Sequence, residues 1–169
     1  AAQLGDRVGL ILDGGECEVG LESTILKLEP AGPVLLRPGG LPLEDIEKIV
    51  GPVRDQSAAA REHPEAPGQM LSHYSPRTPL EVVENVAAIE PVPKNAGLLT
   101  FMPPNKPGPF AAVEVLSREG DLVEAASRLF YCLHRLDDLG LDIIYAEQVP
   151  EQGLGRAIMN RLNRARRSG

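Results

Sequence analysis

The stretch "DLVEAASRLFYCLHRLDDLGLDIIYAEQV", residues 121–149, predicts a helix that is followed directly by a strand. Apolar side chains recur there at helical spacing, namely Leu122, Ala126, Leu129, Phe130, Leu133 and Leu136. Asp121 and Glu124 have the spacing of a capping box, and Gly140 suits the end of a helix. The apolar run at 141–149 is typical of a buried strand.

The rest of the second half extends this pattern in both directions. Residues 79–85, 96–101 and 111–117 are strand-like runs, and 153–167 predicts a basic amphipathic helix. Its inward face would carry Ile158, Leu162 and Ala165. Strands alternating with helices indicate a small α/β layer with at least some parallel pairing.

The first fifty residues predict a second, smaller group of elements. Residues 7–13 form a short apolar run, 22–29 alternate in polarity, and 33–40 form a further strand that ends at glycines. Three strands in quick succession indicate a meander or a mixed sheet. A helix is expected at 41–51, because its apolar positions have helical spacing and Gly51 suits its end.

A proline-rich connector, residues 52–79, separates the two groups and shows no strand pattern. It exceeds the usual loop length, which indicates either disorder or a function. Within it, His73 and Tyr74 stand side by side in a proline-bounded loop. Either they pack locally against a domain surface, or the loop lies over a site and contributes these side chains to it.

Composition limits the classes of protein. The chain has 169 residues, of which 43% are apolar and 24% charged, as in one globular domain or two small ones. Its formal net charge of −7 argues against a protein that wraps a nucleic-acid backbone. No apolar run could span a bilayer, and no signal peptide is evident. Without an initiator methionine, the chain resembles a piece of something longer.

The cysteines and histidines indicate no metal centre. Cys17 and Cys132 are far apart and are expected to be reduced thiols of a cytosolic protein. The three histidines, His63, His73 and His134, are scattered and lack partners at metal-ligand spacing.

Several polar residues allow both a structural and a functional interpretation. The hydroxyls of Ser23 and Thr24 can pair with backbone or bind a polar ligand. Arg37, before a Pro-Gly-Gly turn, is either a solvated charge or a fork for a phosphate. "GLG" at 153–155 could present N–H groups to an anion, although it lacks the third glycine of a dinucleotide fingerprint. Arg161, Arg164, Arg166 and Arg167, near the C-terminus, most simply complement the helix dipole.

The order of four motifs resembles a known family. "DGGECEVGLESTIL", "VLLRPGG", "APGQMLSHYSP" and the run ending in "GLGRAIMNRLNRA" together resemble the C-terminal portion of the long, two-domain threonylcarbamoyl-AMP synthases. The resemblance covers essentially the whole chain. It implies an α/β fold with the C-terminal segment of a twisted catalytic domain at 1–52, a linker or lid at 53–78, and a small Rossmann-like domain at 79–169.

The resemblance also implies an activity. The family joins L-threonine, bicarbonate and ATP into threonylcarbamoyl-adenylate, with release of pyrophosphate. A threonylcarbamoyl transferase complex then uses this product to modify adenosine 37 of tRNA. We therefore expect a cytoplasmic nucleotidyltransferase whose ATP carries Mg²⁺, with no metal held by protein ligands, no membrane partner and no direct contact with nucleic acid.

Residue roles follow only where motifs match. Ser23 matches the family's threonine-contacting serine, Arg37 matches its nucleotide-contacting arginine, and His73 with Tyr74 matches the linker pair that covers the cleft near ATP. No catalytic residue is assigned. The family's Lys-x-Arg and Ser-x-Asn motifs are missing, so we expect this chain alone to have little or no synthase activity. The main alternative is a non-catalytic module that binds a nucleotide or a partner; a double-stranded RNA binder is the least favoured reading.

Overall fold

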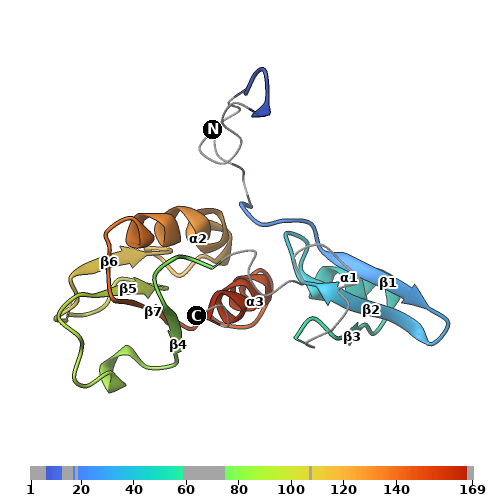
Figure 1. Ribbon diagram of the computed structural model, residues 1–169. Helices are drawn as coiled ribbons and strands as arrows, with labels where there is room; N and C mark the ends of the chain where they lie inside the picture. Colours follow the sequence, from blue (N-terminus) through green and yellow to red (C-terminus); the bar gives the residue numbers. More distant parts are fainter. Residues whose placement is uncertain (1–6, 13–16, 18, 59–74, 107, 167–169) are drawn as a thin grey trace.

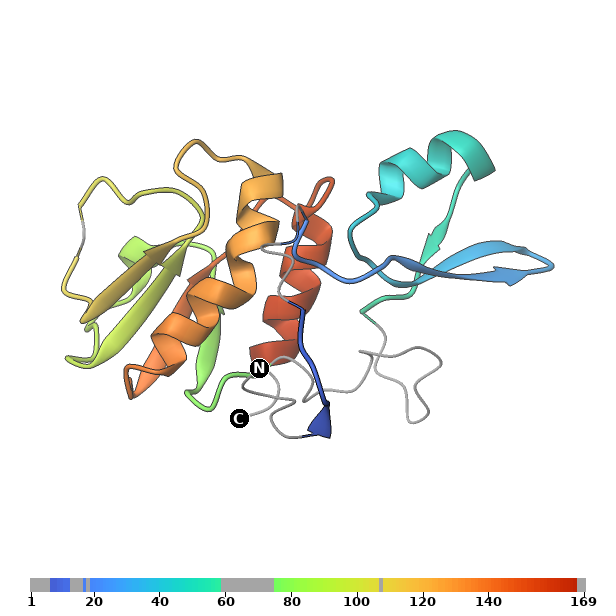
Figure 2. The ribbon, with the colours of Figure 1, turned by 90° about the horizontal axis from the view of Figure 1, so that it is seen from above.

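The computed structural model describes residues 7–12, 17, 19–58, 75–106 and 108–166 (Figure 1). Two groups of elements lie side by side. We call residues 19–58 the N-terminal unit and residues 75–166 the C-terminal unit. Helix α3, Gly155–Arg166, lies between the sheet of the C-terminal unit and the N-terminal unit in both views (Figures 1 and 2).

The N-terminal unit is a three-stranded sheet with one helix. Strands β1 (Ile25–Glu29) and β2 (Gly32–Arg37) pair antiparallel, and the short β3 (Arg54–Asp55) adds to β2 in parallel. Helix α1 (Leu43–Val50) follows β2. The sequence predicted β1, β2 and α1, but it did not indicate β3, which lies in the expected connector. The sheet is mixed, one of the two arrangements that the sequence favoured, but its third strand is β3 and not the predicted run at 7–13.

The C-terminal unit is a four-stranded sheet in which every pairing is parallel. Its order is β4-β7-β5-β6. The strands are β4 (Leu80–Val83), β5 (Ala96–Thr100), β6 (Ala112–Val115) and β7 (Ile143–Glu147). A 3₁₀ turn, η2 (Val86–Ala88), follows β4. The predicted α/β layer with parallel pairing is therefore confirmed.

Helices α2 (Leu122–Asp137) and α3 lie against one face of this sheet and enclose the main core. The predicted stripe of α2 contributes Leu129 and Leu136, both fully buried. The inward face of α3 is also as predicted, with Ile158 and Leu162 fully buried. The sequence pattern therefore located the core of this unit correctly.

The start of α2 differs from a simple capping box. The Asp121 carboxylate accepts hydrogen bonds from the backbone N–H groups of Val123 and Glu124, at 2.6 and 3.0 Å. The Glu124 carboxylate does not reach back to Asp121. Instead, the Ser117 hydroxyl accepts from the Asp121 N–H at 2.8 Å and donates to Glu124 at 2.6 Å. The Ser117 hydroxyl thus bridges the Asp121 N–H and the Glu124 carboxylate, which bond directly in a simple capping box.

The expected strand at residues 7–13 is wrong over the described part, because residues 7–12 form no strand. Leu10 and Leu12 are 77% and 86% exposed. An apolar run forms a strand only where a partner offers backbone hydrogen bonds and a face to bury. No described strand pairs with it.

The short segment before β1 packs against the C-terminal unit. Val19 and Leu21 contact the core of the C-terminal unit, although they belong to the N-terminal unit. Gly20 between them has a φ of 64°, and a Cβ there would lie 2.6 Å from the backbone of Ser127 on α2. Glycine therefore allows this segment to lie directly on the helix, which joins the two units.

No helix in the described part of the chain is long and apolar enough to cross a membrane.

Candidate functional site

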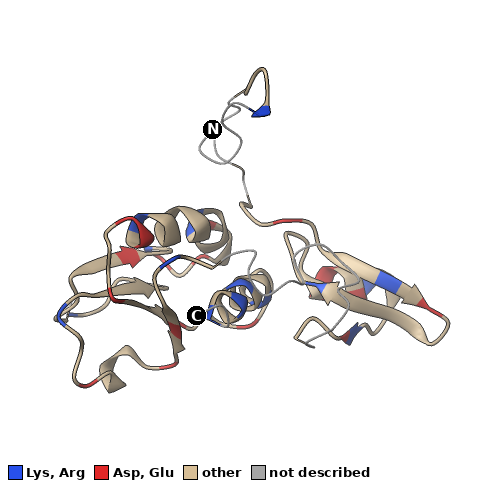
Figure 3. Cartoon of the chain, viewed as in Figure 1, with Lys and Arg blue, Asp and Glu red and all other residues tan. Residues whose placement is uncertain are grey.

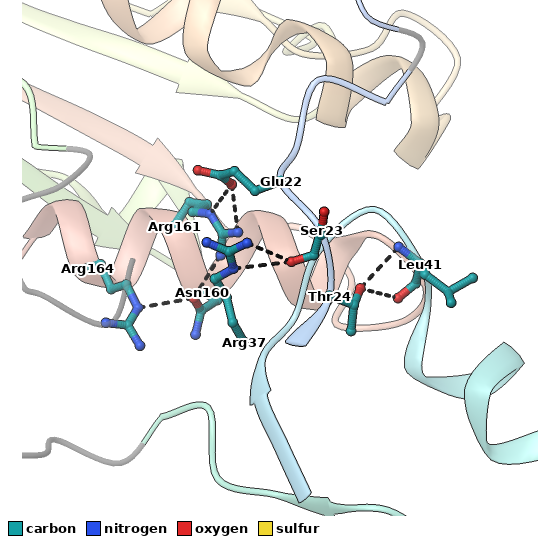
Figure 4. Close-up of polar contacts among 8 residues, drawn as sticks. All are labelled: Glu22, Ser23, Thr24, Arg37, Leu41, Asn160, Arg161 and Arg164. Atoms are coloured by element: carbon teal, nitrogen blue, oxygen red, sulfur yellow. Dashed lines mark hydrogen bonds and ion pairs between the residues drawn. The ribbon is translucent and has the colours of Figure 1, made fainter. Parts of the chain in front are cut away.

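The segment Glu22–Thr24, which leads into β1, is bound on one side to the Pro-Gly-Gly turn after β2. The backbone N–H of Gly40 donates to the carbonyl of Glu22 at 2.8 Å. The Thr24 hydroxyl accepts from the N–H of Leu41 at 3.1 Å and donates to its carbonyl at 2.7 Å (Figure 4). Thr24 therefore has the structural role that a strand hydroxyl can have, and it holds the turn against the segment.

Arg37, at the end of β2, holds the same segment through the backbone carbonyl of Ser23. Its Nε and Nη2 atoms donate to the carbonyl of Ser23 at 3.2 and 2.8 Å (Figure 4). The residue is only 7% exposed. The reading of Arg37 as a solvated charge is therefore wrong, because the guanidinium is buried and oriented. The structure brings Arg37 and Ser23 together, as the expected site requires.

Gly39 permits this close approach. A Cβ at Gly39 would collide with the carbonyl oxygen of Glu22 and would lie 2.5 Å from the carbonyl carbon of Ser23. The glycine of the turn is thus required by contact between two backbones and not by the turn alone.

Ser23 itself is exposed and borders a pocket of about 770 Å³ in the N-terminal unit. The walls come from the segment before β1, from β1 and from α1. They include the apolar residues Val19, Leu21, Leu26, Leu41, Ile46, Ile49 and Val50. Ile49 is 86% exposed on α1, so this side of the unit presents apolar surface around the Ser23 hydroxyl.

Helix α3 reaches the same segment from the C-terminal unit. Arg161, on α3, donates from Nε and Nη2 to one carboxylate oxygen of Glu22, at 3.0 and 2.7 Å. The Arg161 side chain is fully buried, whereas that of Glu22 is about one-third exposed. The segment that carries Ser23 is therefore fastened on one side by the N-terminal unit and on the other by α3 (Figure 4).

A second arginine of α3 extends this network to the base of the connector. The Asn160 side chain accepts from both Arg161 and Arg164, at 3.0 and 3.1 Å. Arg164 also donates to the carbonyl of Ser57 at 3.1 Å, and Ser57 is the last buried residue before the connector leaves the described range. The expectation that these arginines serve the helix C-terminus is wrong for Arg161, and Arg164 lies in the last turn as expected but is buried and also binds the N-terminal unit.

The first turn of α3 makes a further ionic contact. Arg156 lies 3.1 Å from the carboxylate of Glu44 on α1 and 3.6 Å from that of Asp55 on β3. Partial burial acts to raise the pKa of Glu44, but hydrogen bonds from its own backbone N–H and from Arg156 outweigh this and hold the pKa below its usual value. α3 carries four arginines and no acidic residue (Figure 3), and Arg156, Arg161 and Arg164 contact the N-terminal unit.

The glycines of "GLG" have structural explanations. Gly153 has a φ of 52°, which favours glycine. A Cβ at Gly155 would collide with the carbonyl oxygen of Pro150. Both glycines are thus explained by the backbone, and no anion is needed to account for them.

His73 and Tyr74 lie outside the residues that the structure describes, so their expected place over the cleft stays a prediction. Among the described residues, no group of three or more His, Cys, Asp or Glu lies together in a way that could hold a metal ion. Cys132 is buried and Cys17 is exposed.

A larger pocket of about 970 Å³ lies at the carboxyl ends of β5 and β7. Leu98 and Thr100 line it, and they alternate with residues that face α2, so the pocket is on the other face of the sheet. Glu147 borders it and accepts from the backbone N–H of Phe101 at 3.0 Å. Ser23 and Arg37, the predicted site residues that the structure describes, do not line this pocket.

Sequence reasoning missed Glu22, Asn160 and Arg161. The signal for Arg161 was available. It lies three residues after Ile158 and one before Leu162, within the stripe that was predicted to face inward. A charged residue at an inward helical position indicates a buried ionic partner. Glu22 had no comparable signal, because its partner is 139 positions away.

Comparisons with known proteins identify relatives of this chain. The family model described as threonylcarbamoyl-AMP synthase, C-terminal domain, matches residues 41–166. The threonylcarbamoyl-AMP synthase of Pyrococcus abyssi is 38% identical over 174 residues, which cover 94% of this chain and 49% of that protein. The threonylcarbamoyl-AMP synthase of Bacillus subtilis is 35% identical over 177 residues, which cover 98% of this chain and 51% of that protein.

A solved structure shares the fold. The crystal structure of P. abyssi Sua5 complexed with L-threonine superposes with a TM-score of 0.82 at 35% identity, over 96% of this chain and 51% of that one. A structure of the H234A/Y235A form of the same protein gives a TM-score of 0.74 at 36% identity, over 91% of this chain and 47% of that one.

The fold and these matches define a mixed α/β protein of the class that contains the threonylcarbamoyl-AMP synthases. The chain belongs to the threonylcarbamoyl-AMP synthase family and corresponds to its C-terminal portion. It spans about half the length of the curated relatives that it matches.

Proposed function

We propose that this chain forms part of an enzyme that makes threonylcarbamoyl-adenylate and pyrophosphate from L-threonine, bicarbonate and ATP. The observation that supports this most directly is that Ser23 is exposed beside an open pocket. Its backbone carbonyl is held by the buried guanidinium of Arg37. A relative of the same family binds L-threonine in its crystal structure. The product would serve threonylcarbamoyl modification of adenosine 37 in tRNA, in the cytoplasm.

In this proposal the substrates supply the reacting atoms. The threonine amine combines with bicarbonate to give a carbamate and water. A carbamate oxygen then attacks the α-phosphorus of ATP, and pyrophosphate leaves. Since the nucleophile comes from the substrate, the protein acts mainly by orientation and by electrostatic stabilisation. ATP would carry Mg²⁺ as part of the substrate.

Each predicted residue has a place in this scheme. Ser23 orients threonine from the wall of the pocket. Arg37 holds the Ser23 backbone and places a positive charge on the nucleotide side. His73 and Tyr74 close over the site and exclude water, which protects the mixed anhydride from hydrolysis.

The test uses the full-length protein that contains these 169 residues. The measurement is exchange of labelled pyrophosphate into ATP, dependent on threonine and bicarbonate. We expect Ser23→Ala to raise KM for threonine while KM for ATP changes little, and Ser127→Ala on α2 to leave both unchanged. Absence of threonine-dependent exchange in the unaltered protein would refute the function and favour a nucleotide- or partner-binding module.

The 169 residues alone should show little or no exchange. One buried arginine, even with the Mg²⁺ that ATP carries, supplies too little positive charge for the negative charge that develops at the α-phosphate, which normally requires several converging cations. Robust turnover by the isolated chain would contradict this prediction.

A further inference from the structure

We infer that Arg161 of α3 is a positioning residue for threonine binding, because it fixes Glu22 and thereby holds the adjoining Ser23 hydroxyl toward its pocket. The inference rests on the proposed function, in which Ser23 contacts threonine. It assigns to the C-terminal unit a part in the site without any contact between that unit and the substrate.

The first argument is the geometry of the ion pair. Two nitrogens of Arg161, Nε and Nη2, donate to Oε2 of Glu22, and the third, Nη1, donates to Asn160 at 3.0 Å. A planar guanidinium bound along two edges has one orientation, whereas a lysine ammonium could donate from several. Arg161 is 1% exposed, so water does not compete for these bonds.

The second argument is the rigidity of the support. Arg161 projects from a helix whose neighbouring side chains, Ile158 and Leu162, are fully buried in the main core. A functional group is held most accurately when it is supported by side chains locked on a regular element. The Glu22 carboxylate is therefore fixed relative to the C-terminal unit.

The third argument connects Glu22 to Ser23. Neighbouring side chains on an extended backbone point to opposite sides. In Figure 4 the Glu22 side chain is turned toward Arg161, while the Ser23 hydroxyl is not turned toward it and borders the pocket. The Glu22 carbonyl is bound by the Gly40 N–H and the Ser23 carbonyl by Arg37. Arg161 adds to this fixation, since it holds the Glu22 side chain from the other unit.

The same helix offers a matched control. Arg156 also joins the two units, but its ion pairs are with Glu44 on α1 and Asp55 on β3 and not with Glu22. Loss of Arg156 also removes an ionic contact between the units, although the Arg156 side chain is 27% exposed and that of Arg161 is fully buried. The two arginines therefore separate a general docking effect from positioning of Ser23.

The kinetic experiment uses full-length protein and the pyrophosphate exchange assay. Variants are Arg161→Met, Arg161→Lys, Glu22→Gln and, as control, Arg156→Met. We expect Arg161→Met to raise KM for threonine between about 5-fold and 30-fold, the range that 1–2 kcal/mol produces. KM for ATP should change little. Arg161→Lys should be intermediate, because it keeps the charge and loses the fork. Arg156→Met should change KM for threonine by less than about twofold.

Glu22→Gln tests the same pair without replacing a fully buried side chain, because the Glu22 side chain is about one-third exposed. It should raise KM for threonine in the same direction as Arg161→Met. If both leave KM for threonine unchanged in an active protein, the inference is overturned.

Hydrogen exchange gives a readout that does not depend on activity. The amides of Gly40 and Leu41 donate to Glu22 and Thr24, so they report on how firmly the segment is held. Arg161→Met should speed their exchange, while Arg156→Met should not. If the unaltered protein and all variants show no threonine-dependent pyrophosphate exchange, the proposed function is refuted. If the Gly40 and Leu41 amides exchange hydrogen equally fast in Arg161→Met and Arg156→Met, the positioning role is refuted.

Discussion

Nη2 of Arg161 lies 2.7 Å from Oε2 of Glu22, and the two residues are 139 positions apart in the sequence. The pair joins the last helix of the chain to the segment that enters its first described strand. This pair and the hydrogen bond from Arg164 to the Ser57 carbonyl bind the N-terminal unit to α3. The two units are therefore coupled through charged groups at their junction as well as through apolar packing.

Replacing Arg161 should destabilise the fold more than replacing an arginine on the surface. Arg161→Ala removes charge-assisted hydrogen bonds from a buried side chain, and we expect a loss of about 2 kcal/mol in the free energy of unfolding. Arg128→Ala is the control, because its contact with Glu124 is a partly exposed pair one helical turn apart. Urea denaturation measures both. Equal losses would mean that the Arg161 pair contributes no more than a surface pair.

Gly39 and Gly40 should respond differently to the same change. Gly39→Ala would drive a Cβ into the backbone of the Glu22–Ser23 segment, which cannot yield without moving the site. In Gly40→Ala the nearest atom is Cγ1 of the Val19 side chain at 3.2 Å, which can shift slightly. We expect Gly39→Ala to cost about 2 kcal/mol or more and Gly40→Ala less than about 1 kcal/mol. A comparison of melting curves decides it, and similar midpoints would contradict the close backbone contact.

Asp137 should contribute a measurable acid dependence. Its burial acts to raise its pKa, but hydrogen bonds from Thr78 and Arg77 outweigh this and hold the pKa below its usual value. A carboxyl with a lower pKa in the folded state stabilises the fold above its unfolded pKa, and this stabilisation is lost as the pH falls through the folded value. The loss is expected below about pH 4.

The measurement is the free energy of unfolding at pH 7 and at successive values down to pH 2.5. Asp137→Asn should be less stable than the unaltered protein at pH 7 and should show a shallower decline below about pH 4. Asp138→Asn is the control, since it retains Asp137 and alters a carboxylate whose side chain is 75% exposed. An unchanged decline in Asp137→Asn would exclude Asp137 as a source of the acid dependence.

The two cysteines should differ in reactivity. Burial, reinforced by the charge of Glu114, raises the pKa of the Cys132 thiol, whereas Cys17 is exposed. A higher pKa leaves less thiolate, and the buried sulfur is also inaccessible to reagents. Titration with a chromogenic disulfide at pH 8 should therefore label one thiol quickly. In Cys17→Ser the fast phase should disappear until urea is added, and a persistent fast phase would show that Cys132 is accessible.

The sequence alone was sufficient for the elements whose burial follows a regular period. The stripe of α2 and the apolar runs of β5 and β7 locate the core of the C-terminal unit, because burial on one face imposes a spacing that can be recognised locally. Gly39 and Arg37 were singled out by a different local signal, the Pro-Gly-Gly turn that follows a strand. The family resemblance assigned Ser23 and Arg37 to one site, and in the structure the Arg37 guanidinium donates to the Ser23 carbonyl.

The tertiary structure decided what depends on distant partners. β3 is only two residues long and exists because β2 offers it an edge, while the apolar run at 7–12 forms no strand because no described strand pairs with it. Glu22 became part of the site through Arg161, and no local pattern in the sequence specifies a contact across 139 positions. Periodicity records which face of an element is buried; the partner that covers it is fixed only when the whole chain has folded.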